Sequence, residues 1–378
     1  MTLRRAFAFG LVLIAAWVVF STASARAQGT QGPLAPKPGA PVQKAPDNAI
    51  RVKVALVNAP VTVHDAKDEL VLDLKKKDFH VFDNGVEQDI ETFDLGGEPL
   101  SAVLVFETSS RIAPLLPAVQ KSGIVFTQTV IGPSGDAAVL GYNDDVERLL
   151  PFTGDHDKIE KAIANLKTGT SGTRLYDALS MAVGLLRDRP ASRRRVIIIV
   201  AEARDAGSEA KLGEVLREAQ LSNIVIYTVG LSTPAAALRA QPQQAAPVQA
   251  TPPGTFGQPP LPGMAQTPTN EQMRSGYIDV DLLSLAEWAV QNAKAVVKDR
   301  PLEVATVATG GMYQSTFRDR SIENVVDAIG GELNAQYTLS YRLTGSEAAG
   351  YHQIKVTVDR PDVKVRTRPG YYLEAPAE

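Results

Sequence analysis

The stretch Ala102–Arg111, with the sequence Ala-Val-Leu-Val-Phe-Glu-Thr-Ser-Ser-Arg, decides the fold of this chain. Its first half is apolar and rich in valine and leucine, which is typical of a strand buried on both faces of a parallel sheet. Its second half is polar, and an apolar helical pattern follows it. Because ligands of open parallel sheets bind at the carboxyl ends of the strands, we expect the functional site in this loop.

Downstream of Leu100, predicted strands alternate with predicted helices. Apolar runs predict strands at 102–106, 136–142, 146–152, 196–200 and 224–229, and three-to-four-residue spacing predicts helices at 115–129, 155–166, 173–187, 212–220, 280–297 and 322–333. Asp155 or Asp157 is the expected N-cap of the helix at 155–166, and Thr173 that of the helix at 173–187. The alternation with short connections indicates an α/β fold with a doubly wound sheet.

Both flanks of this region have apolar residues at every second position instead. Residues 50–97 contain several such segments, one of them at 70–74, and Asp83-Asn84-Gly85 between two of them is typical of a β-hairpin. The alternation returns at 336–374, which ends in Arg368-Pro369-Gly370-Tyr371-Tyr372. We therefore predict one β-sandwich built from 50–97 and 336–374, with 98–335 inserted between its two parts.

Three segments are not expected to form part of either domain. Residues 1–27 have the charged, apolar and Ala-x-Ala order of a secretory signal peptide, for which an uncleaved membrane anchor is the alternative. Residues 28–49 are rich in proline and predict a linker. Residues 233–275 are also rich in proline and almost free of charge, which predicts a disordered insertion within the α/β region.

The composition excludes several functions. The net charge of −3 gives no electrostatic basis for binding nucleic acid. The chain contains no cysteine, which excludes thiol catalysis, disulfides and cysteine-ligated zinc. It has only four histidines, so a histidine-rich metal site is not expected. The arginine run at 193–195 is predicted to be a solvated entrance to the strand that follows.

Four motifs carry a resemblance to a known family. They are Asp78-Phe79 with Asp83-Asn84-Gly85, the segment 172–179 (Gly-Thr-Arg-Leu-Tyr-Asp-Ala-Leu), Tyr337–Tyr341, and Arg368–Tyr371. Through these motifs, residues 50–373 resemble the von Willebrand factor A-related family of secreted, acidobacterial-type proteins. The resemblance implies a Rossmann-like von Willebrand factor A domain at 98–335, inserted in the β-sandwich formed by its flanks.

The family domain carries a metal-ion-dependent adhesion site, with Asp-x-Ser-x-Ser in the first loop, Thr in the second and Asp in the third. The resemblance places its metal ligands at Glu107, Ser109, Thr173 and Glu202, and it places Arg111 where the second serine is expected. Only Ser109 and Thr173 match the family's pattern. Glutamate is one methylene longer than aspartate, which disturbs the short octahedral coordination of Mg²⁺. Arg111 has no acceptor atom for a cation.

Three arrangements of this degenerate site remain open. In the first, no metal is bound, and the guanidinium of Arg111 lies between Glu107 and Glu202 as a substitute for the cation. In the second, a weakened or rearranged site holds Mg²⁺ or Mn²⁺, with acidic residues of nearby loops such as Asp205 as substitute ligands. In the third, Arg111 points to solvent and Glu107 is only a polar residue. We expect no cofactor, with the divalent cation as the alternative.

We predict a non-enzymatic, exported protein, periplasmic or extracellular, that binds another protein or a surface polymer through these loops. The resemblance implies adhesion or assembly. A passive structural component of the envelope is one alternative. A hydrolase using Ser109 or Ser110 is another, but no Gly-x-Ser-x-Gly motif is present and no histidine is predicted in a neighbouring loop. Membrane contact is expected only through an uncleaved signal segment.

Overall fold

The computed structural model describes residues 56–96, 98–232, 282–292, 300–316, 321–344 and 347–373. All of them belong to one structural unit, Lys53–Glu378. The predicted signal peptide (1–27), linker (28–49) and proline-rich insertion (233–275) lie outside the described residues. In the described part of the chain, none of the helices combines the length and the apolar character needed to cross a membrane.

Strand β5 (Leu100–Glu107) lies inside a six-stranded sheet with the order β10-β9-β8-β5-β6-β7. All of its residues are buried, as the apolar run predicts for a strand covered on both faces. Neighbouring strands run parallel except at the β6–β7 edge, which is antiparallel. The other strands are β6 (Asp136–Tyr142), β7 (Val146–Thr153), β8 (Arg194–Ala201), β9 (Ile224–Gly230) and β10 (Tyr313–Ser315).

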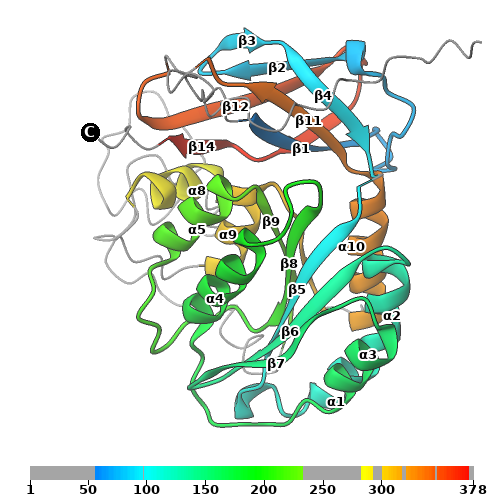
Figure 1. Ribbon diagram of the computed structural model, residues 1–378, viewed down its shortest axis with the longest axis vertical. Helices are drawn as coiled ribbons and strands as arrows, with labels where there is room; N and C mark the ends of the chain where they lie inside the picture. Colours follow the sequence, from blue (N-terminus) through cyan, green and yellow to red (C-terminus); the bar gives the residue numbers. More distant parts are fainter. Residues whose placement is uncertain are drawn as a thin grey trace, which may run out of the picture. The chain divides into compact units, whose positions relative to one another are not determined.

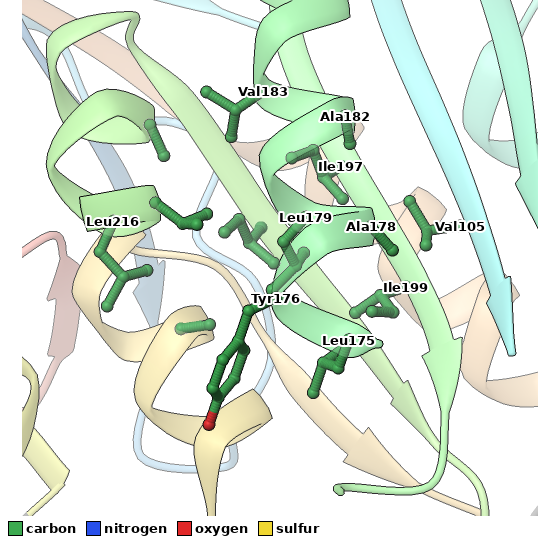
Figure 2. Close-up of a cluster of buried hydrophobic side chains, with 14 of the residues drawn as sticks. Val105, Leu175, Tyr176, Ala178, Leu179, Ala182, Val183, Ile197, Ile199 and Leu216 are labelled. Atoms are coloured by element: carbon green, nitrogen blue, oxygen red, sulfur yellow. The ribbon is translucent and has the colours of Figure 1, made fainter. Parts of the chain in front are cut away.

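Helices cover both faces of this sheet (Figure 1). One face packs against α4 (Leu175–Arg187), α5 (Leu212–Leu221), α8 (Leu282–Gln291) and α9 (Pro301–Thr309). The other packs against α1 (Leu116–Lys121), α3 (His156–Ala164) and α10 (Ile322–Ala335). Figure 2 shows the first core, where Leu175, Ala178 and Leu179 of α4 lie over Val105 of β5 and Ile199 of β8. Two cores separated by a mainly parallel sheet confirm the doubly wound α/β fold.

The predicted helix at 115–129 is broken into three short pieces. Helix α1 is followed by α2 (Gly123–Val125) and by a π-helical turn, Phe126–Ile131. Hydroxyl groups explain the breaks: Ser122 donates a hydrogen bond to the carbonyl of Val119 (2.7 Å) and Thr129 to that of Val125 (2.8 Å). Such bonds compete with the helix's own hydrogen bonds and bend it. The apolar spacing therefore predicts the buried face of this segment correctly, but the prediction of one continuous helix is wrong.

The flanks form two antiparallel four-stranded sheets, ordered β13-β1-β11-β4 and β14-β12-β2-β3. Each sheet mixes strands from the two ends of the chain, which confirms the predicted β-sandwich with an inserted α/β region. The strands are β1 (Leu56–His64), β2 (Phe79–Asp83), β3 (Val86–Gln88), β4 (Ile90–Leu95), β11 (Tyr337–Arg342), β12 (Gly350–Val358), β13 (Lys364–Thr367) and β14 (Gly370–Leu373).

In the sandwich, the predicted hairpin between β2 and β3 is confirmed, and the predicted strand at 70–74 is not. Asn84 and Gly85 have φ of 47° and 82°, so the predicted hairpin between β2 and β3 closes with two left-handed residues. The predicted strand at 70–74 is wrong, because beyond the bridge at Leu70 this segment is not a strand. The Tyr337 hydroxyl bonds its backbone instead, accepting from Leu74 N–H (3.2 Å) and donating to the Val71 carbonyl (3.0 Å).

The arginines at 193–195 are not the solvated entrance that the sequence predicts. All three are only partly exposed and are held by hydrogen bonds at the amino end of β8. Arg194 Nη1 donates to the carbonyl of Leu333 (2.7 Å), and Arg195 Nη1 to the carbonyl of Ser222 (2.8 Å). The guanidinium groups satisfy backbone carbonyls that secondary structure leaves unpaired, so their role is structural.

Candidate functional site

Glu107 is the last residue of β5, and its carboxylate is buried at the carboxyl edge of the sheet. Its Oε1 accepts a hydrogen bond from Ser109 Oγ (2.5 Å), and its Oε2 accepts one from the backbone N–H of Glu202 (2.7 Å). Burial raises the pKa of Glu107, and these two hydrogen bonds partly offset the effect. The carboxylate therefore joins the loop after β5 to the loop after β8.

Ser109 and its neighbours are fixed by the loop that precedes α4. The backbone N–H of Ser110 donates to the carbonyl of Thr170 (2.8 Å), and the N–H of Gly169 donates to the carbonyl of Thr108 (2.7 Å). Ser109 is fully buried, and its hydroxyl is committed to Glu107. The loop is thus a rigid connection rather than an open pocket around a serine.

Arg111 lies in the short 3₁₀ turn Ser110–Ile112 and reaches the loop after β8. Its Nε donates to Glu202 Oε2 at 3.0 Å. The Glu202 side chain is 4% exposed, whereas that of Arg111 is 23% exposed. The guanidinium thus covers a buried carboxylate and keeps one side in solvent. It pairs with Glu202, while both oxygens of Glu107 are taken by other donors.

Thr173 joins the same region through the backbone. It forms an isolated bridge with Ala206, whose N–H donates to the Thr173 carbonyl at 2.8 Å. The predicted N-cap role of Thr173 is wrong: the N-cap position of α4 falls on Arg174, and its side chain makes no capping bond. The Thr173 hydroxyl is buried and has no hydrogen-bond partner among the described residues. By contrast, Asp155 caps α3 as predicted.

The groups that cap α4 come from the loop after β8, which the sequence analysis did not single out for this role. The N–H of Tyr176 donates to Asp205 Oδ1 (3.2 Å) and to Ser208 Oγ (3.1 Å). Asp177 in turn accepts hydrogen bonds from the next two N–H groups along that loop. Burial raises the pKa of Asp205, against the effect of its hydrogen bond from Ser208. Local sequence spacing cannot predict these caps, because donor and acceptor lie about thirty residues apart.

Tyr142 is a further buried polar residue near the site. It ends β6, is fully buried, and its hydroxyl has no hydrogen-bond partner in the described part of the chain. Burial raises its pKa well above the ordinary value, and the nearby carboxylates of Glu107, Asp205 and Glu202 add to the effect. Tyr142 is therefore a neutral phenol at the base of an acidic cluster.

The residues at these positions do not fit a resident divalent cation. The unpartnered hydroxyl of Thr173 is a suitable oxygen ligand. However, the Ser109 hydroxyl donates to Glu107, and a permanently charged guanidinium occupies Glu202. Within the described ranges, no group of three or more histidine, aspartate and glutamate side chains is arranged to hold a metal ion. Charge balance at the buried Glu202 carboxylate comes from Arg111.

Comparison with known proteins identifies the class of the α/β region. Residues 117–204 match the family described as von Willebrand factor type A domain. The match includes Thr173 and Glu202 and begins beyond Glu107, Ser109 and Arg111. The match and the sheet topology agree that the α/β region has the fold of a von Willebrand factor type A domain. The comparison with curated proteins gives no match.

Several solved structures are similar to this chain at low sequence identity. The conserved hypothetical protein BatB from Bacteroides thetaiotaomicron is 13% identical, with a TM-score of 0.38 over 62% of this chain and 98% of its own. An aerotolerance-related membrane protein from Bacteroides fragilis has the same identity and coverage and a TM-score of 0.39. The vWF domain of the type V pili tip protein Mfa5 from Porphyromonas gingivalis is 21% identical, with a TM-score of 0.26 over 29% of this chain and 39% of its own.

Proposed function

We propose that this chain is an exported, non-enzymatic binding protein that engages a protein or a surface polymer through the carboxyl edge of its six-stranded sheet. Domains of the von Willebrand factor type A family are in general protein-interaction modules. One observation supports the proposal for this chain: Arg111, which stands where the resemblance expects a serine, forms an ion pair with Glu202, where the resemblance expects a metal ligand. The site is then a metal-free form of an adhesion site.

The partly exposed guanidinium supplies the binding chemistry. In the part of the chain that the structure describes, Nε is the only nitrogen of Arg111 with a hydrogen-bond partner. Its terminal nitrogens remain available to a carboxylate of a partner, which arginine can bind through two parallel hydrogen bonds. Such a contact needs no metal and weakens as salt increases.

The environment of Ser109 supports a function other than catalysis. A serine nucleophile needs an accessible hydroxyl and a base that takes its proton. Ser109 is fully buried, and its hydroxyl donates a hydrogen bond to a carboxylate that also accepts from a backbone N–H. Hydrolysis of an ester, peptide or glycoside panel by the purified protein, lost on Ser109→Ala, would contradict the proposal.

Export is proposed from the N-terminal sequence, which has the order of a signal peptide. Mass spectrometry of the protein recovered from the periplasm and medium of an expressing bacterium checks this part. The expected N-terminus follows Ala27. Recovery of an uncleaved chain in the membrane fraction would instead favour the anchor.

The metal-free site is tested by thermal unfolding of residues 28–378 in Mg²⁺, Mn²⁺ and EDTA, with Arg111→Ser measured in parallel. A cation at a hundredfold its Kd stabilises the native state by about 2.7 kcal/mol, which corresponds to roughly 5–10 °C in a domain of this size. We expect no cation-dependent shift in the wild type. A shift of that size in the wild type would show that the site holds metal and that Arg111 is not its substitute.

Binding is tested in EDTA on sensor surfaces coated with poly-glutamate or poly-lysine. We expect the wild type to bind poly-glutamate at low salt and Arg111→Ser to lose most of that binding. Arg111→Lys keeps the charge but not the bidentate geometry, so it should bind more weakly than the wild type. Equal binding by all three variants would show that Arg111 is not the contact, and would favour the passive structural component.

A further inference from the structure

The four-stranded sheet β14-β12-β2-β3 contains a buried histidine with an unusual set of neighbours. His352 lies on β12, and its side chain is 6% exposed. Its Nδ1 is 2.8 Å from Asp83 Oδ1, and its Nε2 is 2.7 Å from the carbonyl oxygen of Ala348. The ring stacks on that of Tyr371 in β14, with 5.0 Å between the ring centroids.

The two shorter contacts of the imidazole are with acceptors, and a third contact, at 3.3 Å from Nδ1, is with the donor Asn84 Nδ2. A carbonyl oxygen and an ionised carboxylate can only accept, so each ring nitrogen must carry a proton to satisfy both contacts. A neutral imidazole has one N–H and would leave one of the two contacts unsatisfied. The two shorter contacts therefore favour the charged imidazolium.

Asp83 lies at the centre of this cluster. Its second oxygen, Oδ2, accepts hydrogen bonds from the hydroxyl groups of Tyr341 (2.9 Å) and Tyr371 (2.7 Å). With His352, three donors from β11, β12 and β14 converge on one buried carboxylate at the end of β2.

Several other charged and titratable groups lie around His352. Burial acts to lower its pKa, but the Ala348 carbonyl, Asp83 and the negative charge of Glu347 outweigh burial and raise the pKa above 6.5. The buried guanidinium of Arg368 also lies in this cluster, close enough to interact electrostatically with Asp83 and Tyr371. Asn84 Nδ2 is 3.3 Å from Nδ1 and can donate to that nitrogen only when Nδ1 has lost its proton.

The neighbouring strand β14 connects the sandwich to helix α5. His352 pairs with Tyr371 in the β12–β14 ladder. Arg368, just before β14, donates from Nη1 to the carbonyl of Gln220 in α5 (3.2 Å). Tyr372, which follows Tyr371 in β14, lies under the guanidinium of Arg217, whose Cζ is 3.9 Å from the centroid of the Tyr372 ring. Residues on both sides of Tyr371 therefore contact the same helix.

We propose that His352 forms a pH-dependent link between β2, β12 and β14. As an imidazolium it holds the three strands together, and it releases β14 when it loses its proton. In the neutral form, Nδ1 turns from Asp83 to the amide of Asn84, and one carboxylate oxygen loses its donor from β12. The stacked Tyr371 then loses a charged partner, and the attachment of β14 to α5 weakens. The device belongs to the fold and is independent of the proposed binding site.

His80 in the same sheet is a matched control. It also sits between two acceptors, with Nδ1 2.7 Å from Glu87 and Nε2 3.1 Å from Asp359. Its side chain is 36% exposed, however, and both carboxylates are largely in solvent. Salt therefore screens the contacts of His80 much more strongly than those of His352.

The first measurement is an NMR titration of the histidine ring resonances between pH 5 and 9, in low salt and in 1 M NaCl. We expect the midpoint of His352 above 6.5 in both, and that of His80 above 6.5 only in low salt. Amide hydrogen exchange of Tyr372 and Leu373 should accelerate as pH rises through the His352 midpoint, beyond the tenfold per unit of base catalysis that other strand amides show. This readout distinguishes a pH-dependent link between the strands from a histidine that is only buried.

The second measurement is urea unfolding across the same pH range for the wild type, His352→Gln and His80→Gln. A histidine whose pKa is higher in the folded state stabilises that state below 6.5, and the effect disappears as pH rises through the folded pKa. The folded-to-unfolded ratio should fall about tenfold for each unit by which the NMR midpoint exceeds 6.5. His352→Gln should lose this pH dependence, and His80→Gln should keep it.

Three outcomes would overturn the proposal. They are a His352 midpoint at or below 6.5, exchange of β14 that follows the other strands throughout, and a pH profile of His352→Gln equal to that of the wild type. The first two use the wild-type protein, so the proposal remains testable if His352→Gln does not fold.

Discussion

Arg111 in the α/β domain and His352 in the sandwich both place a cation beside a buried carboxylate, yet the two ion pairs differ in what surrounds the cation. Arg111 covers Glu202 with one nitrogen and keeps part of its guanidinium in solvent. His352 is closed on both sides, by Asp83 and by the carbonyl of Ala348. An open cation can bind a partner, whereas a closed one can only hold its own neighbours together.

The two cations also respond differently to pH. The arginine side chain is charged at every pH at which proteins usually fold. Histidine titrates near neutrality, so the pair in the sandwich depends on its surroundings. The proposed roles follow this difference, with recognition for the first pair and conditional stability for the second.

The largest effect is expected from Asp83→Ala. The substitution removes the acceptor of three buried donors and leaves the imidazolium of His352 beside Arg368 without a counter-charge. We expect the free energy of unfolding at pH 6 to fall by about 3–5 kcal/mol, as for other broken buried pairs. Urea unfolding measures it, with Asp83→Asn as the milder control. A loss below about 1 kcal/mol would show that the cluster is solvated.

Removing Arg111 and removing the charge of Glu202, the two partners of the ion pair at the sheet edge, should destabilise the protein by different amounts. Arg111→Ala removes the guanidinium that pairs with the buried Glu202 carboxylate, and we expect a loss of about 2–3 kcal/mol, below that of a fully buried pair. Glu202→Gln leaves a guanidinium that can turn to solvent, so the loss should be about 1 kcal/mol. Urea unfolding of both variants and of the double variant tests this order. Equal losses would mean that Arg111 does not compensate the charge of Glu202.

A smaller effect on stability is expected at two buried threonines, one in each of the two regions compared. The hydroxyl groups of Thr173 at the sheet edge and Thr62 in the sandwich are both buried without a hydrogen-bond partner among the described residues. Thr→Val keeps the shape and removes the hydroxyl, so each substitution should change the free energy of unfolding by less than about 1 kcal/mol. A clearly larger loss for Thr173→Val, measured by thermal unfolding, would show that its hydroxyl binds a group that the metal-free proposal omits.

The smallest effect concerns the exposed control, His80. The hydrogen bond that His80 donates to Glu87 is the main cause of its raised pKa, ahead of the contact with Asp359. Glu87→Gln should therefore lower the NMR midpoint of His80 more than Asp359→Asn does, with no measurable change in stability, because both carboxylates are exposed. The reverse order would mean that the longer contact dominates.

Much of the fold follows from local patterns. The buried strand at 102–106, the strand at 136–142 and the Asn84-Gly85 turn appear where the sequence predicts them. Helix α9 was missed, because Val304, Thr306, Val307 and Thr309 lower its helix propensity. Tertiary packing overrides that preference, since most of the helix is buried against β9 and its neighbours.

The candidate site was only partly predictable. The resemblance selected Glu107, Ser109, Arg111 and Glu202, and the structure brings these four into one chain of contacts. It could not predict which carboxylate Arg111 contacts, since that depends on where two loops about ninety residues apart meet. The Asp83–His352 pair could not be predicted either, because its residues lie 269 positions apart in the sequence.

The sequence by itself determined the fold class, the loops in which the site lies, and the departures of Glu107, Arg111 and Glu202 from the family's pattern. Periodicity and residue type carry this information, because burial and hydrogen-bonding capacity act locally along the chain. Only the tertiary structure decided which charges meet and how far each is exposed. An ion pair depends on a distance of a few ångströms and on the surrounding solvent, and both are set when distant strands and loops pack together.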